Sequence, residues 1–295
     1  MYESYYGLKK NPFSIVPDPQ YLYLGTSHRE ALSQLLYGIK EKKGFIVLTG
    51  EVGTGKTILL HYLLDKINTD GQTKAVFLFN PKLSVDDFIH YILRDLGVDA
   101  ENATKGKALY LLSQTLRAIL QKGGQFILFV DEAQSLGQEL LEEVRLLSNL
   151  ETTEARMIQI VLVGQPELDE LFKQPRFRQI KQRINLRYHL RPLSYHETEE
   201  YIEKRLKITG AKNPLFTKRA VKEIYDYSGG VPRLINILCD NSLLNAFASD
   251  LTVVDTECVE EAAKDLQINM PPIRNLLRFL SSMVFKGKRL FLRTR

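Results

Sequence analysis

Residues 50–57 read Gly50-Glu51-Val52-Gly53-Thr54-Gly55-Lys56-Thr57, an eight-residue stretch of the form G-x-x-x-x-G-K-[ST]. The apolar run at 45–48 before it is typical of a buried strand, and the run at 58–64 after it is typical of the start of a helix. Glycines let successive backbone N–H groups turn toward one anion, and the N-terminus of a helix adds its dipole. The stretch therefore predicts a strand, a phosphate-binding loop and a helix in an α/β fold.

The end of this loop predicts a nucleoside triphosphate as the ligand. Lys56 is placed to reach the β- and γ-phosphates, and the hydroxyl of Thr57 is a suitable ligand for Mg²⁺. The alternative is a glycine-rich turn with no ligand, which the fit of both flanks disfavours. We expect nucleotide contacts from the whole loop and from the residue after it: Gly50, Glu51, Val52, Gly53, Thr54, Gly55, Lys56, Thr57 and Ile58.

The chain has 295 residues, 44% of them hydrophobic and 25% charged, which is ordinary for one large or two modest globular domains. Its formal net charge of +5 is unevenly distributed. Residues 273–295 hold seven Lys or Arg and no acid, so the remainder of the chain carries −2. The composition therefore gives no support to a basic, nucleic-acid-binding surface over the body of the protein.

Cysteine and histidine give no sign of a disulfide framework or a zinc site. Cys239 and Cys258 fall within predicted helices without metal-ligand spacing, so we expect reduced core residues of a cytosolic protein. The five histidines form no HxH or HxxxH pattern. The N-terminus lacks the pattern of a cleaved signal, and no apolar run approaches the roughly 20 residues that span a bilayer. These features predict a cytoplasmic protein.

Apolar runs and helical patterns alternate up to Arg191-Pro192. Strands are predicted at 45–48, 75–79, 126–130, 157–163 and 184–190, and helices at 57–68, 84–96, 105–122, 137–149 and 166–173. Strands that are apolar on both faces and separated by helices predict a parallel sheet between two helical layers. Only helices are predicted beyond 191, at 194–209, 217–228, 231–248 and 255–267. We therefore divide the chain into a nucleotide-binding core with an N-terminal arm (1–191), a helical lid domain (192–270) and a tail (271–295).

Two carboxylates, Asp131 and Glu132, directly follow the apolar strand predicted at 126–130. Asp131 could hold the Mg²⁺ sphere, and Glu132 could orient and deprotonate an attacking water. An ordinary acidic turn after a strand is the alternative. Their position about 75 residues after Lys56 favours the catalytic interpretation, because the metal and the γ-phosphate must meet at one edge of the sheet.

Gln165 follows the next predicted strand, beside Asp131 and Glu132 in a parallel sheet. Its amide could donate a hydrogen bond to the γ-phosphate or to the water. The alternative is a turn residue before Pro166.

Five arginines lie between 176 and 191, at 176, 178, 183, 187 and 191. A guanidinium supplied by a neighbouring subunit stabilises charge on the γ-oxygens during phosphoryl transfer. We predict that Arg183 has this role, with Arg178 as the second choice. The alternative for either residue is a solvated surface charge.

The stretch Gly229-Gly230-Val231-Pro232-Arg233 opens a predicted helix of the second domain. Proline in the first turn of a helix is ordinary. Arg233 is less so, because the helix dipole disfavours a cation near the N-terminus. We therefore predict an anionic partner for Arg233, the bound nucleotide, and a plain surface arginine is the alternative.

Together these features resemble the AAA+ ATPases. The spacer sequences more narrowly resemble the general secretion pathway protein A (ExeA-like) ATPases and the related exosortase (PEP-CTERM) locus ATPases of exopolysaccharide gene clusters. This resemblance covers residues 1 to about 268. It rests on Tyr2-x-x-Tyr-Tyr-Gly-Leu8, Asn11-Pro-Phe13, Pro17-Asp-Pro19, Leu24-x-x-x-His28-Arg-Glu-Ala-Leu32, Tyr37-Gly-Ile39, Gly44-Phe45, Asp131-Glu-Ala-Gln134, Leu146-Leu-Ser-Asn-Leu-Glu151, Val163-Gly-Gln-Pro-Glu-Leu168 and the segment 183–193.

The resemblance implies a three-layer αβα P-loop NTPase core with a five-stranded parallel sheet in the order 5-1-4-3-2. It also implies hydrolysis of ATP to ADP and phosphate, Mg-ATP at the junction of core and lid, and ring-like oligomers, for which we expect a hexamer. Tyr23 and His28 are then expected near the adenine. ExeA-like proteins continue into a transmembrane span and a periplasmic peptidoglycan-binding domain. This sequence contains neither, so we expect the shorter exosortase-locus type and no binding to the cell wall.

The tail places apolar residues 273, 276, 277, 280 and 284 at helical spacing among basic residues. This pattern is typical of a helix on an anionic membrane surface. A helix docked on the body or on a neighbouring subunit is the alternative, and a patch of nucleic-acid contacts is a third.

Function follows from these expectations. We expect a Mg-dependent ATPase that drives conformational change in an oligomer, peripheral on the inner membrane, and serves envelope secretion or exopolysaccharide assembly through an unidentified protein partner. The alternative is an ATP-dependent, DNA-binding transposition regulator of the TniB/TnsC kind. The acidic body and the absence of a helix-turn-helix pattern argue against it. A non-hydrolysing scaffold is a third possibility.

Overall fold

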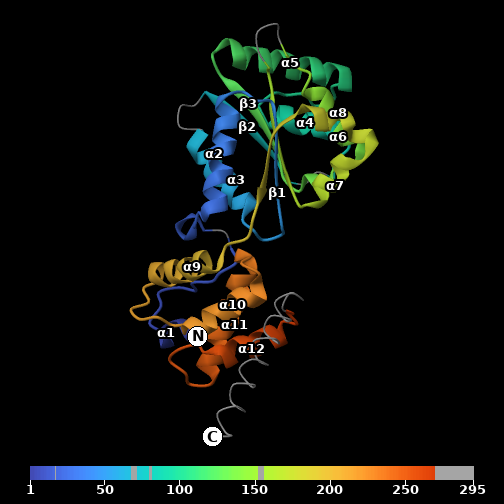
Figure 1. The fold of residues 1–295 in the computed structure, drawn as a ribbon. Helices are drawn as coiled ribbons and strands as arrows, with labels where there is room; N and C mark the ends of the chain where they lie inside the picture. Colours follow the sequence, from blue (N-terminus) through green and yellow to red (C-terminus); the bar gives the residue numbers. More distant parts are fainter. Residues whose placement is uncertain (17, 68–71, 80–81, 152–155, 270–295) are drawn as a thin grey trace, which may run out of the picture. The chain divides into compact units, whose positions relative to one another are not determined.

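The computed structural model describes residues 1–16, 18–67, 72–79, 82–151 and 156–269 (Figure 1). The chain folds into two compact units. We call Thr26–Arg191 the core unit, and the helical unit comprises Met1–Gly25 together with the residues from Pro192 onward. The tail predicted at 271–295, and with it the expected membrane-surface helix, lies outside the described residues.

A parallel five-stranded sheet forms the centre of the core unit. Its strands are β1 (Phe45–Gly50), β2 (Thr73–Leu78), β3 (Gln125–Val130), β4 (Gln159–Gly164) and β5 (Ile184–Leu190). Their order is β2-β3-β4-β1-β5, which confirms the predicted order. Every pair of neighbours is parallel. The residues of β1, β3 and β4 are almost all buried, whereas the edge strand β5 alternates in exposure, as expected for a sheet covered on both faces.

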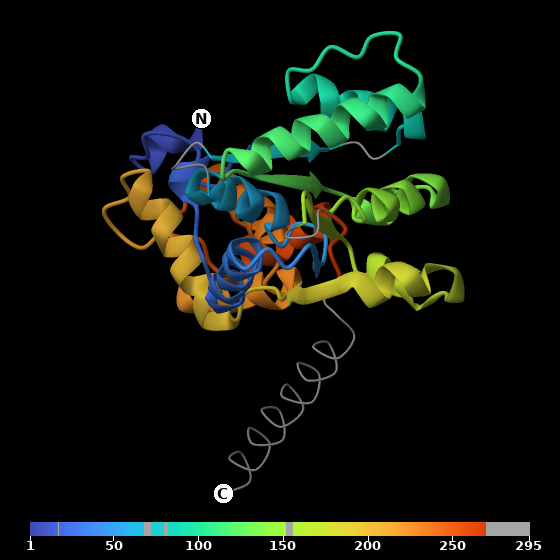
Figure 2. The same ribbon diagram turned by 90° about the horizontal axis from the view of Figure 1, so that it is seen from above.

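Helices cover both faces of this sheet. The core helices are α2 (Thr26–Lys40), α3 (Lys56–Ile67), α4 (Val85–Asp95), α5 (Lys105–Gln121), α6 (Gln138–Leu147), α7 (Glu167–Lys173) and α8 (Arg178–Arg183). Figures 1 and 2 agree in placing α2 and α3 on one side of the sheet and α6 and α7 on the other. Side-chain caps define where several helices begin: Ser84 accepts a hydrogen bond from the Asp87 N–H at the start of α4. The result is the predicted αβα arrangement of three layers.

The helical unit is built from α1 (Tyr2–Tyr5), α9 (Tyr195–Ile208), α10 (Lys218–Ser228), α11 (Pro232–Ala248) and α12 (Thr256–Asp265). A capping box starts α9, because Ser194 and Glu197 each bond the other's backbone N–H. Ile224, Ile235 and Leu238 are fully buried at the centre of the apolar cluster of this unit.

The N-terminal arm differs from the predicted domain organisation. We expected residues 1–25 with the core, but they belong to the helical unit. Leu8 and Phe13 of the arm are buried in the same apolar cluster as α9 to α12. Arg205 of α9, itself buried, donates from Nη1 to the carbonyl of Pro12 at 2.8 Å. Two contributions therefore hold the arm against these helices. Its apolar side chains are removed from water, and its backbone carbonyl accepts a hydrogen bond from the charged guanidinium of Arg205.

Within the described ranges, none of the helices combines the length and apolar character that a bilayer crossing requires.

Candidate active site

The glycine-rich loop connects the end of β1 to α3 in the core unit. Gly53 and Gly55 have φ angles of 80° and 98°, in the region that glycine adopts without strain. Gly50 is required for another reason: a Cβ there would lie 2.8 Å from the carbonyl oxygen of Leu190 in β5. The glycines of the motif thus serve both the curl of the loop and the close packing of two parallel strands.

Lys56 is the first residue of α3, and only 6% of it is exposed. Its Nζ donates hydrogen bonds to the carbonyls of Gly50 (2.7 Å) and Glu51 (3.0 Å). Burial lowers the pKa of the Lys56 ammonium, and the nearby carboxylates, Glu132 first among them, act in the opposite direction. The loop therefore encloses a cation whose partners are neutral carbonyl oxygens.

The two residues expected to hold a metal are in direct contact. Asp131 directly follows β3 and is 5% exposed, and its Oδ2 accepts a hydrogen bond from the Thr57 hydroxyl at 2.7 Å. A hydroxyl and a carboxylate are the hard oxygen ligands that Mg²⁺ prefers, and this ion usually takes only one or two protein ligands beside phosphate oxygens and waters. The donor set fits Mg²⁺. No cluster of three or more metal-binding His, Cys, Asp or Glu exists among the described residues.

Glu132 is held by two amide side chains. Its backbone is left-handed, with φ of 50°. Its Oε2 accepts hydrogen bonds from Gln165 Nε2 at 3.0 Å and from Gln134 Nε2 at 2.5 Å. Gln134 in turn accepts the backbone N–H of Gln165 through Oε1 at 3.0 Å. The structure therefore joins the ends of β3 and β4 through one network of amide and carboxylate groups.

Sequence reasoning gave no role to Gln134, although it stands in the Asp131-Glu-Ala-Gln134 stretch. Its contact depends on which strand lies beside β3, and the chain itself gives no local sign of that. Gly164 at the end of β4 leaves room for the Gln134 side chain, since a Cβ there would lie 2.6 Å from Gln134 Oε1, and this too becomes visible only once the strands are paired.

His28 lies in α2 and is 5% exposed. Its Nε2 donates to the carbonyl oxygen of Thr54, inside the glycine-rich loop, at 2.8 Å. Tyr23 belongs to the helical unit, where its hydroxyl donates to Glu200 Oε2 at 2.5 Å. The expected contacts of both residues with adenine stay predictions, but His28 has a definite contact with the loop backbone.

The candidate arginines differ in exposure. Arg183 is half-buried, and its Nη1 donates to the hydroxyl of Ser148 in the same core unit at 2.7 Å. Arg178 at the start of α8 is exposed, and within the described ranges it has no side-chain hydrogen bond or ion pair. Arg187 pairs with Asp169 at 3.2 Å. Of the two predicted candidates, Arg178 is therefore the more exposed, and the role of either one toward a neighbouring subunit stays a prediction.

Arg233 is the second residue of α11 and is exposed. The helix begins there because Pro232 occupies its first position. Arg233 lies in the helical unit, and its expected contact with a nucleotide stays a prediction.

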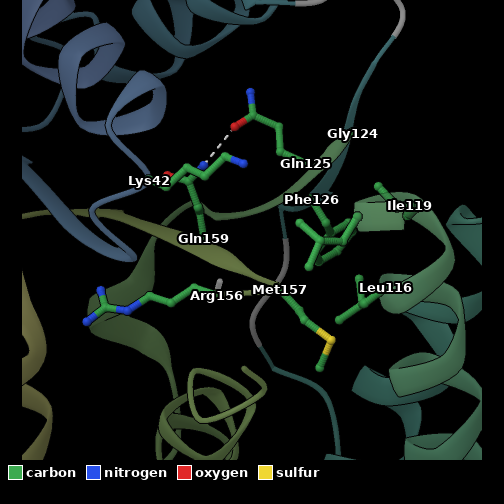
Figure 3. A pocket seen from close by; sticks show the side chains of 10 residues that line it. Lys42, Leu116, Ile119, Gly124, Gln125, Phe126, Arg156, Met157 and Gln159 are labelled. Carbon is green, nitrogen blue, oxygen red and sulfur yellow. Dashed lines mark hydrogen bonds between the residues drawn. The ribbon is translucent and has the colours of Figure 1, made fainter. Parts of the chain in front are cut away.

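A small depression lies where β3 and β4 begin, whereas the glycine-rich loop follows the end of β1. Figure 3 shows the side chains that line it. Gln125 and Phe126 at the start of β3 and Gln159 at the start of β4 contribute to its lining, and Gln159 Nε2 donates to Gln125 Oε1 at 2.9 Å. The depression has room for about one water molecule. It is too small for a nucleotide and is separate from the candidate site.

The sequence profile of a family described as "AAA domain" matches residues 39–172, a range that includes the loop, Asp131, Glu132 and Gln165. Over 249 residues the chain is 43% identical to the General secretion pathway protein A of Aeromonas hydrophila, covering 84% of this chain. The chain is an ExeA-like AAA+ protein. It spans 45% of the length of that relative, or about half.

Solved structures agree with the AAA+ fold. Cdc6p from Pyrobaculum aerophilum has a TM-score of 0.68 at 19% identity, covering 86% of this chain and 70% of its own. The ORC2 protein of Aeropyrum pernix, solved as ADPNP-ADP complexes, has a TM-score of 0.63 at 18% identity, with coverage of 87% and 71%. The RuvB Holliday junction branch migration motor of Thermotoga maritima has a TM-score of 0.54 at 18% identity, with coverage of 82% and 69%. At these identities the likeness shows the AAA+ fold alone.

Proposed function

We propose that this AAA+ protein binds Mg-ATP and hydrolyses it to ADP and phosphate. The observation that carries the proposal is the meeting of three strand ends. In the order β3-β4-β1, the glycine-rich loop follows β1, Asp131 and Glu132 follow β3, and Gln165 follows the strand between them. The Thr57–Asp131 and Glu132–Gln165 hydrogen bonds tie these ends together. A phosphate chain on the loop would therefore end beside a carboxylate and an amide, the groups that hydrolysis needs.

Each side chain then has a distinct task. Lys56 exchanges the neutral carbonyls of Gly50 and Glu51 for phosphate oxygens, which are stronger acceptors because they are charged. Thr57 and Asp131 hold Mg²⁺, which when bound supplies positive charge against the phosphate oxygens. Glu132 orients the water and takes its proton. The Gln165 amide, which donates to Glu132 in this structure, can instead donate its hydrogen bond to the γ-phosphate.

The output of hydrolysis is proposed to be a change in the angle between the two units. The chain passes between them twice, at Gly25–Thr26 and at Arg191–Pro192. A rotation of the helical unit would therefore pull on α2 and on β5, both of which contact the glycine-rich loop. We further propose that Arg233 contacts the nucleotide from the helical unit and that Arg178 or Arg183 reaches the nucleotide of a neighbouring subunit in a ring.

The cellular process is proposed from the relative. A likeness to General secretion pathway protein A supports service in envelope secretion or exopolysaccharide assembly through a protein partner. The basic, apolar pattern of residues 273–295 supports a peripheral position on an anionic inner-membrane surface.

Glu132→Gln tests the proposed reaction. The variant keeps the shape of the side chain and removes the base, so we expect ATP affinity within about threefold of wild type and hydrolysis lower by about 10²-fold or more. Glu139→Gln, at an exposed position at the start of α6, is the matched control and should hydrolyse ATP as wild type does. Unchanged turnover by Glu132→Gln would refute the assigned base.

A further inference from the structure

The peptide unit between Thr54 and Gly55 is held by a hydrogen bond from the α2 side of the loop. His28 Nε2 donates to the Thr54 carbonyl oxygen at 2.8 Å, and both residues are buried. The side chain of Thr54 is fixed as well, because its hydroxyl donates to the carbonyl of Glu51 at 2.8 Å. Gly55, the other half of this peptide, has a φ of 98°. A histidine from a helix that precedes β1 in the chain thus contacts the middle of the phosphate-binding motif.

Because a peptide unit is planar, the hydrogen bond from His28 also sets the direction of the Gly55 N–H. In a planar trans peptide the C=O of one residue and the N–H of the next point in opposite directions, and the described chain contains no cis peptide bond. Fixing the Thr54 carbonyl toward α2 therefore fixes the Gly55 N–H away from α2. Glycine allows both signs of φ, so this peptide could otherwise rotate and turn its carbonyl inward, where it would repel an anion.

We propose that His28 is a positioning residue for phosphate binding: it keeps the Gly55 N–H directed into the loop in the protein without nucleotide. His28 does this through Nε2–H, not by filling space. The ligand in this inference rests on the proposed function, since the anion is the phosphate of a nucleotide. The orientation of the peptide does not rest on it and can be measured without any ligand.

Two substitutions separate the donor from the ring. His28→Phe keeps an aromatic ring and removes the donor, whereas His28→Gln removes the ring and keeps an N–H at about the same reach. The loss of one hydrogen bond that orders a binding loop predicts an affinity for Mg-ATP and Mg-ADP about five- to tenfold weaker in His28→Phe. His28→Gln should bind within about twofold of wild type. The measurement is titration calorimetry of the full chain.

Nuclear magnetic resonance gives the readout that needs no nucleotide. The sequence contains three Thr-Gly pairs, Thr49-Gly50, Thr54-Gly55 and Thr209-Gly210. Labelling with ¹³C at the threonine carbonyl and ¹⁵N in glycine therefore reduces the amide spectrum to three signals. We expect a single sharp Gly55 signal in wild type and His28→Gln. In His28→Phe that signal should broaden or double, while Gly210 in the helical unit stays unchanged.

A packing role predicts the reverse order: normal affinity and a sharp Gly55 signal in His28→Phe, and losses of both in His28→Gln. That result would overturn the inference. If wild type bound no nucleotide, the proposed function would fail, and the Gly55 comparison among the three proteins would still decide the role of His28.

Discussion

Gly230 and Gly229 offer a prediction in which one added methyl group has two very different costs. Both residues lie before α11 and have positive φ angles, 78° and 63°. A Cβ at Gly230 would lie 1.9 Å from the carbonyl oxygen of Leu193, which is backbone and cannot turn aside. A Cβ at Gly229 would meet nothing within 4 Å. Gly230→Ala should therefore destabilise the protein far more than Gly229→Ala.

The difference can be estimated from the structure. In both variants the alanine must adopt a left-handed backbone, which costs about 1–2 kcal/mol. In both, alanine also restricts the unfolded chain more than glycine does, which offsets part of that cost by the same amount. These contributions cancel between the two variants. Gly230→Ala must also separate two backbone segments and so lose the hydrogen bond from Leu193 N–H to the Gly230 carbonyl (2.8 Å), about 1 kcal/mol. The displacement of packed backbone adds about 1–3 kcal/mol, as in overpacked cores. We expect a difference of about 2–4 kcal/mol in the free energy of unfolding.

The assay is urea unfolding followed by circular dichroism on the two variants and wild type. We expect a modestly lower midpoint for Gly229→Ala, by about 1 kcal/mol in the free energy of unfolding, and a much lower midpoint for Gly230→Ala with the same slope. Equal midpoints for the two variants would show that Gly230 does not approach Leu193 so tightly in solution. The result bears on the site because Arg233 lies three residues after Gly230 on the helix that this contact positions.

Two further predictions concern the chemistry of the site. Gln134→Leu should lower the hydrolysis rate about tenfold or more and leave ATP affinity within about threefold of wild type, because the Gln134 side chain hydrogen-bonds to Glu132 and Gln165 but not to the loop. Steady-state kinetics beside the exposed-site control Gln121→Leu would check this. An unchanged hydrolysis rate in Gln134→Leu would argue against it. ATP affinity should fall as the pH rises from neutral toward 10.5, because burial places the pKa of Lys56 below its ordinary 10.5 and the charge that attracts phosphate is lost above that pKa. Calorimetry across this pH range measures the effect, and a constant affinity would contradict it.

Much of the fold could be predicted because its signals are local. Buried parallel strands are continuous apolar runs, and the strands predicted at 126–130 and 184–190 coincide with β3 and β5 within one residue. The order of the strands came from family resemblance, and the structure confirms it. Short helices such as α8 were not predicted, since six residues give too little periodicity to recognise.

The rest depended on contacts between segments far apart in the chain. The N-terminal arm carries no sign of its partner, because aromatic and proline residues would suit either unit equally well. Gln134 acquires its contacts only when β4 lies beside β3. His28 was expected near adenine from resemblance, and its hydrogen bond to the Thr54 carbonyl became visible only once α2 was placed against the loop.

One measurement tests the central claim most directly: the fate of γ-labelled ATP on purified wild-type protein, with retention and phosphate release followed in the same sample. The arrangement of Lys56, Thr57, Asp131 and Glu132 predicts Mg-dependent retention of the nucleotide followed by release of labelled phosphate, and retention without release in Glu132→Gln. Wild-type protein that neither retains the label nor releases phosphate, at a concentration high enough for self-association, would contradict it.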